Sequence, residues 1–515
     1  MKNKILIITL SVLSVIFINS CTKDFDEINK DPNYPGLEKA SPDMLLTNAV
    51  ESLTDRVHEI FIGHEMGSGW VQHMAKVQYT DEDRYNYRIS VVNNTWNSLY
   101  GNSGMDVETI LRYAKANNLK NYEGVALVLK SYISSLLTDM FGDVPYSQAW
   151  KAVDDVSATL PAYDTQESIY MDVIAKLDTA NSLLSVTNEK VKGDILYAGD
   201  ITKWKKFANS LRLRLLLRMS DKNISFVTTE MSKMTDAANA ETYPIFESNA
   251  DNASLVYLGS LPNNNPINEN RKTRDDHRVS KTLVDFMYTN NPKVDWRITA
   301  YAQLAESPGD YVGLPNGLLS ADALAYKGNG LKETSTLGVD FTSATAPGVL
   351  MSFAELKFIL AEAAVKGYIG GGIAVAQTHY EAGILASYQQ HEATIVARTK
   401  ALFGPATATL ASLYTDYMTN GGAAWDPTIA MNQIAYEKWI ALFDQGLQAF
   451  IEWRRLDYPV LTAPVASENS GKVPSRYPYP SDENARNGSS LDAAVQAQNF
   501  SSSADLNGKV WWDIH

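Results

Sequence analysis

Residues 136–146 read Leu136-Leu137-Thr138-Asp139-Met140-Phe141-Gly142-Asp143-Val144-Pro145-Tyr146, and they lie in the stretch 122–150 that organises the chain. Before this turn, apolar side chains recur three or four positions apart, which predicts a helix with one buried face. Gly142 can adopt the left-handed conformation that ends a helix, and Pro145 prevents the helix from continuing. Asp139 and Asp143 flank the stop, and we expect them to accept hydrogen bonds from free backbone amides. The stretch therefore predicts a buried helix, a sharp turn and an extended exit.

The rest of the chain also predicts mainly helices. Helical patterns cover residues 41–60, 91–116, 165–184, 204–219, 280–288, 351–366, 380–388, 434–442 and 445–455. The glycines of 63–69 are expected to break the first of these helices. Residues 220–348 form a loop-rich insertion with one short strand at 256–258. The tail after residue 455 is too rich in Pro, Gly and Ser for regular structure, but its aromatic side chains should anchor it to the body.

The composition is that of a folded chain. Of the 515 residues, 45% are hydrophobic and 20% are charged, enough for a large core. The 45 Lys and Arg against 59 Asp and Glu give a net charge of −14, a poor match for nucleic acid. One Cys and seven scattered His exclude a structural zinc site, and we expect no metal and no cofactor. The acidic run 81–83 could hold calcium, but a solvated loop is the simpler interpretation.

The N-terminus predicts a lipoprotein signal peptide over residues 1–20. A basic start precedes the apolar run Ile5 to Ile18, which is shorter than the roughly 20 residues of a membrane span. Ser20 then precedes Cys21, the only cysteine, which therefore has no internal disulfide partner. We expect acylation of Cys21, because two or more acyl chains give stable anchoring. Residues 21–40 would form the lipidated tether.

Several strings together resemble the SusD-like (SusD/RagB) outer-membrane nutrient-binding lipoproteins. They are Ile28-Asn29-Lys30-Asp31-Pro32-Asn33, the turn 138–146, Phe207-Ala208-Asn209-Ser210-Leu211-Arg212, Glu452-Trp453-Arg454-Arg455 and the closing Trp511-Trp512-Asp513. The sequence departs from the pattern at Gln448, Phe450 and Leu456-Asp457. The resemblance implies a mostly α fold: one domain, 41–515, with a tetratricopeptide-like scaffold of helical pairs, long loop-rich insertions and few short strands.

The resemblance also implies a function. The protein would be a non-enzymatic lipoprotein of the outer membrane that faces the cell exterior and captures glycan or peptide fragments. It would deliver this oligosaccharide or oligopeptide ligand to a SusC-like TonB-dependent transporter. Two alternatives stay open: a tetratricopeptide-like interaction scaffold with no small ligand and, less favoured, a glycoside hydrolase with two positioned carboxylates. Arg454 and Arg455 could bind an anion, although pairing with acidic side chains is the simpler interpretation.

The ligand site should combine aromatic rings with Asn, Asp and Arg on loops, because sugars stack on rings and their hydroxyls need polar partners. Two stretches have this character. The candidates are Trp70, Tyr79, Tyr85 and Trp96 in the first, and Asn265, Arg271, Arg274 and Asp275 in the second, joined by Trp296, Tyr311 and Tyr326. Core packing is an equally good interpretation of Trp96, and plain solvation is the simpler one for the loop Asn and Arg. Arg and Asp would suit a charged peptide, whereas an aromatic platform would suit a glycan.

The anchor can be tested by replacing the single thiol. We expect Cys21→Ala to abolish palmitate labelling and to release the protein from membranes, because the acyl chains supply the binding energy. The measurement is metabolic labelling followed by membrane fractionation. Palmitate that remains on the alanine variant would show that Cys21 is not the modified residue.

Overall fold

The computed structural model describes residues 41–153, 156–290, 294–404 and 406–514. The expected signal peptide, Cys21 and the tether lie outside the described residues. The rest is mostly helical, with three two-stranded sheets. This architecture confirms the predicted fold class.

The helices of the described chain follow in order. They are α3 (Pro42–His58), α4 (Ile89–Asn97), α5 (Met105–Ala116), α6 (Lys120–Phe141), α7 (Gln166–Leu183), α8 (Ile201–Arg218), α9 (Ile224–Thr235), α10 (Pro266–Arg271), α11 (Lys281–Val284), α12 (Ile298–Tyr301), α13 (Ser320–Ala325), α14 (Gly330–Glu333), α15 (Val339–Thr342), α16 (Phe353–Val365), α17 (Gly372–Gln390), α18 (Glu392–Phe403), α19 (Leu410–Asn420), α20 (Ala430–Ala441), α21 (Gly446–Leu456), α22 (Ser481–Arg486) and α23 (Gly488–Ala497). Three π-helical segments also occur: η1 (Ile60–Ser68), η3 (Ser98–Gly104) and η8 (Asp285–Thr289).

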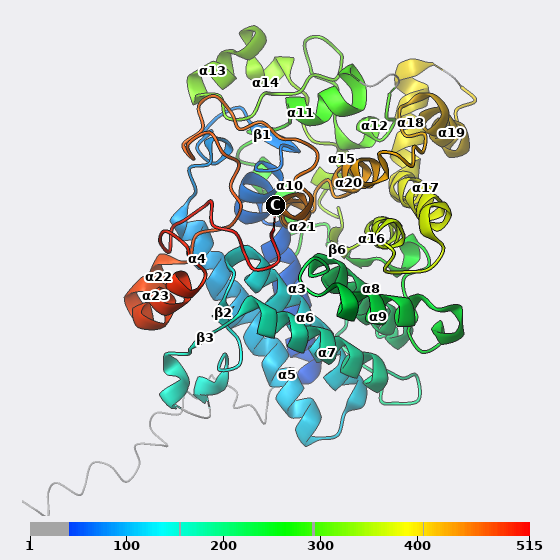
Figure 1. The fold of residues 1–515 in the computed structure, drawn as a ribbon. Coiled ribbons are helices and arrows are strands. Elements are labelled where there is room, and N and C mark those ends of the chain that lie inside the picture. Colours follow the sequence, from blue (N-terminus) through cyan, green and yellow to red (C-terminus); the bar gives the residue numbers. More distant parts are fainter. Residues whose placement is uncertain (1–40, 154–155, 291–293, 405, 515) are drawn as a thin grey trace, which may run out of the picture.

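The strands form three small antiparallel pairs. β1 (Met74–Lys76) pairs with β5 (His277–Val279), β2 (Val144–Pro145) with β3 (Tyr163–Asp164), and β4 (Ala253–Leu255) with β6 (Gly348–Met351). The predicted strand at 256–258 lies immediately after β4. β1 and β5 join segments some 200 positions apart, at the upper left of Figure 1.

Helix α6 is the central element of the lower body in Figure 1, where α5 and α7 pack against it. Among the described helices it alone is long and apolar enough to cross a membrane, but 94% of its most apolar window is buried inside the fold. It is therefore a core helix. The helix ends at Gly142, as predicted, with φ +92° and ψ −131° rather than the left-handed helical conformation. A Cβ there would lie 2.0 Å from the Gln498 side-chain oxygen, so only glycine fits.

The turn after α6 positions the next helix. Asp143 accepts a hydrogen bond from the backbone amide of Gln166 at 2.9 Å, so it satisfies a free amide at the start of α7, as expected. Thr165 and Asp200 cap α7 and α8 through their side chains. Helix α7 begins within one residue of the predicted start, whereas α8 begins three residues before the predicted residue 204. Neighbouring helices in sequence pack together as α5–α6, α6–α7, α7–α8 and α16–α17. This is the expected arrangement of helical pairs.

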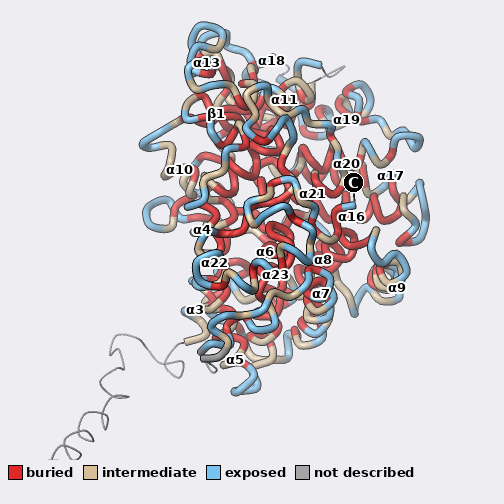
Figure 2. The backbone as a smooth tube through the Cα atoms, turned by 60° about the vertical axis from the view of Figure 1, so that its left-hand side comes forward, coloured by how far each residue is buried: buried red, intermediate tan, exposed pale blue. Residues whose placement is uncertain are grey.

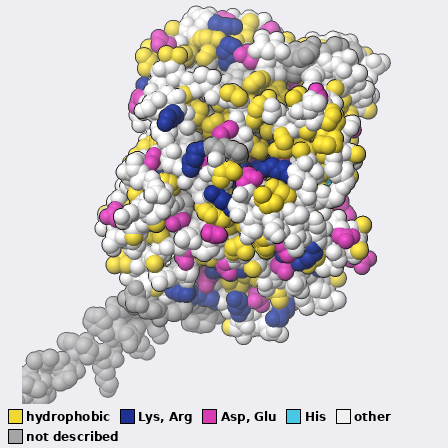
Figure 3. All heavy atoms as spheres, viewed as in Figure 1, with side chains coloured by type: hydrophobic (Ala, Val, Ile, Leu, Met, Phe, Trp, Pro, Cys, Tyr) yellow, Lys and Arg dark blue, Asp and Glu magenta, His cyan; other side chains and the backbone are white. Residues whose placement is uncertain are grey.

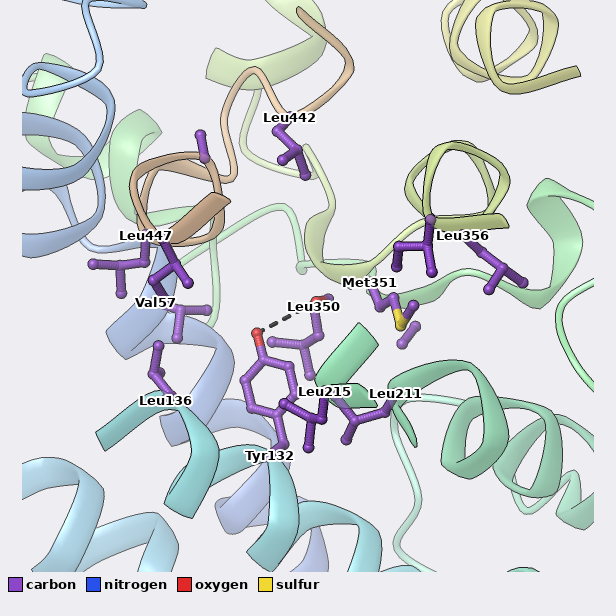
Figure 4. Close-up of a cluster of buried hydrophobic side chains, with 14 of the residues drawn as sticks. Val57, Tyr132, Leu136, Leu211, Leu215, Leu350, Met351, Leu356, Leu442 and Leu447 are labelled. Atoms are coloured by element: carbon purple, nitrogen blue, oxygen red, sulfur yellow. Dashed lines mark hydrogen bonds between the residues drawn. The ribbon is translucent and has the colours of Figure 1, made fainter. Parts of the chain in front are cut away.

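The core runs continuously through the described body. Figure 2 shows buried backbone concentrated along the axis of the molecule and exposed backbone at its rim. Figure 4 shows one part of this core, in which Leu136, Leu215, Leu350 and Leu447 converge from four segments far apart in the sequence. Tyr132 lies among them and donates its hydroxyl to the Leu350 carbonyl at 3.3 Å. The four elements are thus joined by one apolar contact surface.

Two local predictions were wrong. Residues 60–68 do not break the chain but continue it as the buried π-helix η1. Its glycines permit a close crossing with α21, because a Cβ on Gly67 would lie 2.8 Å from the Gly446 carbonyl carbon. The tail is partly regular, since α22 and α23 occupy 481–497. Its aromatic anchors are nevertheless in place: Tyr477, Tyr479 and Trp512 are all buried.

A buried ionic network joins α6, α8, α16, α20 and α21. Arg218 on α8 pairs with Asp139 on α6 at 2.6 Å and with Glu452 on α21 at 2.7 Å. Glu452 also accepts from Lys438 on α20 at 2.7 Å. Arg455 on α21 bridges Glu452 and the α16 carboxylate Glu362, at 3.0 and 2.6 Å. Three acids and three bases are therefore matched without solvent.

This network corrects the expectation for Asp139. Its carboxylate binds no backbone amide; it accepts from the Trp512 indole N–H at 2.7 Å and from the Tyr170 hydroxyl at 2.5 Å, besides pairing with Arg218. The neighbouring cations lower the pKa of Glu452 well below its usual range, although burial opposes this. The expected pairing of Arg455 with acids is confirmed, whereas Arg454 donates to the carbonyls of Asp139 and Ser475.

We expect Arg218→Met to destabilise the protein by about 3–5 kcal/mol, because it leaves two buried carboxylates without their cation. The measurement is urea unfolding followed by circular dichroism. The matched control is Lys332→Met, which removes an exposed pair with Glu306 and should cost at most about 1 kcal/mol. Equal effects of the two variants would contradict the central role of the network.

Candidate ligand-binding surface

Five of the predicted site residues are buried in the core. Trp70 is 0% exposed, Tyr85 2%, Trp96 5%, Asn265 1% and Tyr311 3%. Of the five, Trp96 lines a cavity of about 390 Å³ beside Tyr100 and Trp150, but very little of its side chain is exposed there, so we look for the site among the other candidates.

The burial of each has a local cause. Trp70 stacks on Tyr477 of the tail, with ring centroids 5.0 Å apart. Trp96 packs edge-on against Phe141 at 5.1 Å, so core packing explains it. Asn265 caps α10 by accepting from the amides of Ile267 and Asn268. A Trp70→Ala substitution would therefore change the stability of the fold rather than ligand binding.

Four other predicted residues gather at the β1–β5 sheet. Tyr79 follows β1 and is 56% exposed. The Arg274 guanidinium lies 3.9 Å from the centre of the Tyr79 ring and is held there by Asp276, at 2.9 and 2.7 Å. Beside it, Arg271 and Asp275 form a two-bond ion pair at 2.9 Å each. We call the group Tyr79, Arg271, Arg274 and Asp275 the Tyr79 surface.

Tyr326 lies at the same sheet, because it packs against the small cluster of Ala75, Val77 and Leu314. The nearby helix α13 meets the strand exit where the Ser320 hydroxyl accepts from the Thr80 amide at 3.2 Å. Trp296 is elsewhere: it is half-buried against Phe403, and its indole N–H donates to Asp416 at 3.3 Å. The structure therefore unites five of the eleven predicted residues.

Tyr79 carries backbone strain. Its φ is +53°, a left-handed conformation that costs a bulky residue about 1–2 kcal/mol. Strain of this kind persists where the surroundings hold it, often at functional sites. Here the strained backbone presents a large aromatic ring to solvent, which an apolar core would not require. The stacked guanidinium fixes that ring in place.

The acidic run beside this surface is not solvated as expected. Glu82 and Asp83 are buried; Lys76 pairs with Glu82 at 3.0 Å, and its amide donates to Asp83 at 2.7 Å. Burial raises the pKa of Asp83 to about 7. No group of three or more His, Cys, Asp or Glu that could hold a metal occurs among the described residues. The run supports the base of the Tyr79 surface instead.

A second concave feature was missed by the sequence reasoning. Two adjoining cavities of about 270 and 370 Å³ share Asn432 and Tyr458. Tyr436, Phe286 and the exposed Ile429 line the first. Figure 3 shows hydrophobic side chains gathered on this face near α20. We call it the Tyr458 groove; Tyr436 lies within a predicted helix and gave no separate signal.

Comparison with known proteins places this geometry in a family. A family model described as starch-binding and associating with the outer membrane matches residues 34–480. The chain belongs to the SusD-like family. Proteins of this family bind their ligands without catalysis, so the hydrolase alternative is set aside. Membership also associates the chain with the outer membrane.

Solved structures with a similar fold agree with this family assignment. A chitin-binding protein is 27% identical and superimposes with a TM-score of 0.78, covering 92% of this chain and 100% of its own. A SusD homologue from Bacteroides fragilis is 24% identical, with a TM-score of 0.75 and coverages of 92% and 99%. A chitin-binding SusD homologue from Flavobacterium johnsoniae is 24% identical, with a TM-score of 0.73 and coverages of 92% and 98%. No curated protein matched the chain.

Proposed function

We propose that this SusD-like protein is a lipid-anchored surface receptor that captures oligosaccharide fragments at the Tyr79 surface. It passes them to a SusC-like TonB-dependent transporter. The observation that supports this site is the exposed Tyr79 ring, which a strained backbone presents to solvent and against which Arg274 is stacked. The family and the 27% identical chitin-binding structure support a glycan as the ligand.

The chemistry of the surface suits a sugar. An exposed aromatic ring offers an apolar face to the C–H face of a pyranose, and any sugar unit of a chain that has such a face can make this contact. Arg271, Arg274 and Asp275 add donors and acceptors for hydroxyl groups around the ring. Each of these charges already has a partner, so the surface carries little net charge to attract an ionic peptide. This balance favours a neutral glycan over a charged peptide.

The rigid support of the surface also fits capture. Arg278 on β5 donates to the carbonyls of Asp275, His277 and Leu331, so the loop before β5 is tied to α14. Such ties lower the entropy lost when a ligand binds. An interaction scaffold without a small ligand would need no strained, exposed ring on this support.

We expect Tyr79→Ala to weaken oligosaccharide binding at least tenfold, equivalent to about 1.4 kcal/mol, because the stacking face is lost. Tyr79→Phe keeps that face and should bind nearly as well as the parent. Calorimetric titration of the full-length chain in mild detergent, against neutral oligosaccharides including chitin oligomers and against oligopeptides, measures both.

The Tyr458 groove supplies the matched control. Tyr458→Ala removes a partly buried ring on a different face and should leave the affinity within twofold. If Tyr458→Ala abolishes binding while Tyr79→Ala does not, the ligand occupies the groove and the assignment of the Tyr79 surface is wrong.

The transporter partnership is tested by extraction. We expect the protein to co-purify with a large outer-membrane transporter after gentle detergent treatment. Lasting protein–protein complexes bury more than about 1,000 Å² of surface, and an interface of that size should survive the extraction. The measurement is affinity purification with chemical cross-linking. Recovery of the lipoprotein alone, with no cross-linked partner, would contradict this.

A further inference from the structure

A third cavity, on the side of the body away from the Tyr79 surface, has unusual electrostatics. It measures about 680 Å³ and lies among α9, the loop after it, α16 and α17. Figures 1 and 2 both place α9 and α17 at the right of the molecule and β1 at the upper left. The volume lies within the range of small-ligand sites, about 300–1,000 Å³. We call it the Lys357 cavity.

The cavity contains a lysine without a counter-ion. Lys357 on α16 lines it, and the ammonium lies 4.9 Å from the centre of the Phe353 ring. Among the described residues no carboxylate pairs with it, and burial alone lowers its pKa. Lys357 is half-buried, and a cation that loses part of its hydration normally has a paired acid, because removing a charge from water is costly. In a chain of net charge −14, such a lysine is a specific local feature.

His379 on α17 faces the same cavity. Burial, together with a smaller effect of the Lys357 charge, lowers the pKa of His379 to about 4. At neutral pH it is therefore an uncharged imidazole that can donate one hydrogen bond. The two side chains thus present a cation and a polar N–H in one cavity.

The acids that line the cavity are already engaged. Glu247 accepts from Lys206 at 2.6 Å, and Asp236 accepts from the backbone amide of Ala238 at 2.9 Å. Neither contributes to the pKa of Lys357, so neither serves as its counter-ion. Lys233 and Arg212 lie 5.0 and 5.9 Å from the centre of the Tyr243 ring, but both pair with Glu230, so Lys357 remains the unpaired cation among the described residues of the lining.

Much of the remaining lining is apolar: Met234, Pro244, Ile245, Leu360, Ile369 and Val375. The Ser232 and Thr235 hydroxyls also line the cavity, and they donate to the carbonyls of Tyr368 and Met231. An apolar wall beside one cation suits a ring that bears both a C–H face and an anionic group. A uronic acid residue has both, whereas a free inorganic anion would leave the wall unused.

We propose that the Lys357 cavity binds the carboxylate of an acidic sugar, a uronic acid residue within an oligosaccharide. Lys357 supplies the opposite charge, His379 donates a hydrogen bond and the apolar wall contacts the sugar ring. This inference rests on the proposed glycan-binding function but uses a different site. The protein would then select its ligands by the charge of the sugar as well as by its shape.

The test compares two forms of one sugar. Trigalacturonic acid and its fully methyl-esterified form share one sugar backbone, and the ester replaces each carboxylate by an uncharged methyl ester. Each is titrated calorimetrically into the full-length chain in mild detergent. We expect the acid to bind at least tenfold more tightly than the ester, and the affinity to fall with added salt. Equal binding of the two forms, or no binding of either, would overturn the proposal.

The variants locate the site. Lys357→Met should remove the preference for the acid while Lys357→Arg restores it, and unchanged thermal melting shows that the fold is intact. Lys400→Met, an exposed lysine on α18, is the matched control and should change nothing. If Lys357→Met binds the acid as the parent does, the cavity is not its site.

Two further titrations separate this proposal from the others. Tyr79→Ala should lose neutral oligosaccharides yet keep trigalacturonic acid, so failure of the Tyr79 surface leaves the cavity proposal standing. A triglutamate peptide should bind at least tenfold more weakly than the sugar acid. If the peptide binds equally well with the same dependence on Lys357, the cavity recognises a carboxylate alone and the uronic acid assignment is wrong.

Discussion

The structure depends on the pairing of Arg218 with Asp139 and Glu452. Charges buried to this extent must be matched, because an unpaired one costs several kcal/mol. The match requires α6, α8 and α21 to meet at one point, and Lys438, Arg455 and Glu362 extend the requirement to α20 and α16. Apolar burial supplies most of the driving force, but it is not directional. The ionic network therefore selects one arrangement of the helical pairs from the several that would bury similar area.

Because the helical body is fixed in this way, both proposed ligand-binding sites lie at its periphery. The Tyr79 surface lies on a two-stranded sheet that joins distant segments, and the Lys357 cavity lies where helical pairs meet a loop. One surface presents a ring with balanced charges, and the other holds an unbalanced charge beside an apolar wall. The division suggests separate contacts for the neutral and the acidic parts of a ligand.

Much of the fold could be predicted from the sequence, because its signals are local. The periodicity of α6 and the stop at Gly142 depend on residues within one or two turns. The features that could not be predicted depend on distant partners. The continuation through η1 needs the close approach of Gly67 to Gly446, and the burial of Trp70 needs Tyr477.

The candidate site follows the same rule. Residue type drew attention to Tyr79 and Arg274 and equally to Trp70 and Tyr85. Exposure separates the two pairs, and exposure is set by the tertiary fold. The sequence did not single out Lys357 as a site residue, because a single lysine on a helix is normally interpreted as a solvated side chain. What distinguishes it is the absence of an acid opposite, and this can be judged only when the neighbouring elements are in position.

The contact between the Trp512 indole and Asp139 spans 373 positions, and it has a consequence for biosynthesis. Helix α6 emerges from the ribosome long before Arg218, Glu452 and Trp512 are made. Its acidic group therefore has no complete set of partners until translation is almost finished, and contacts this distant also form slowly. The buried network can therefore close only after the last residues of the chain have been made.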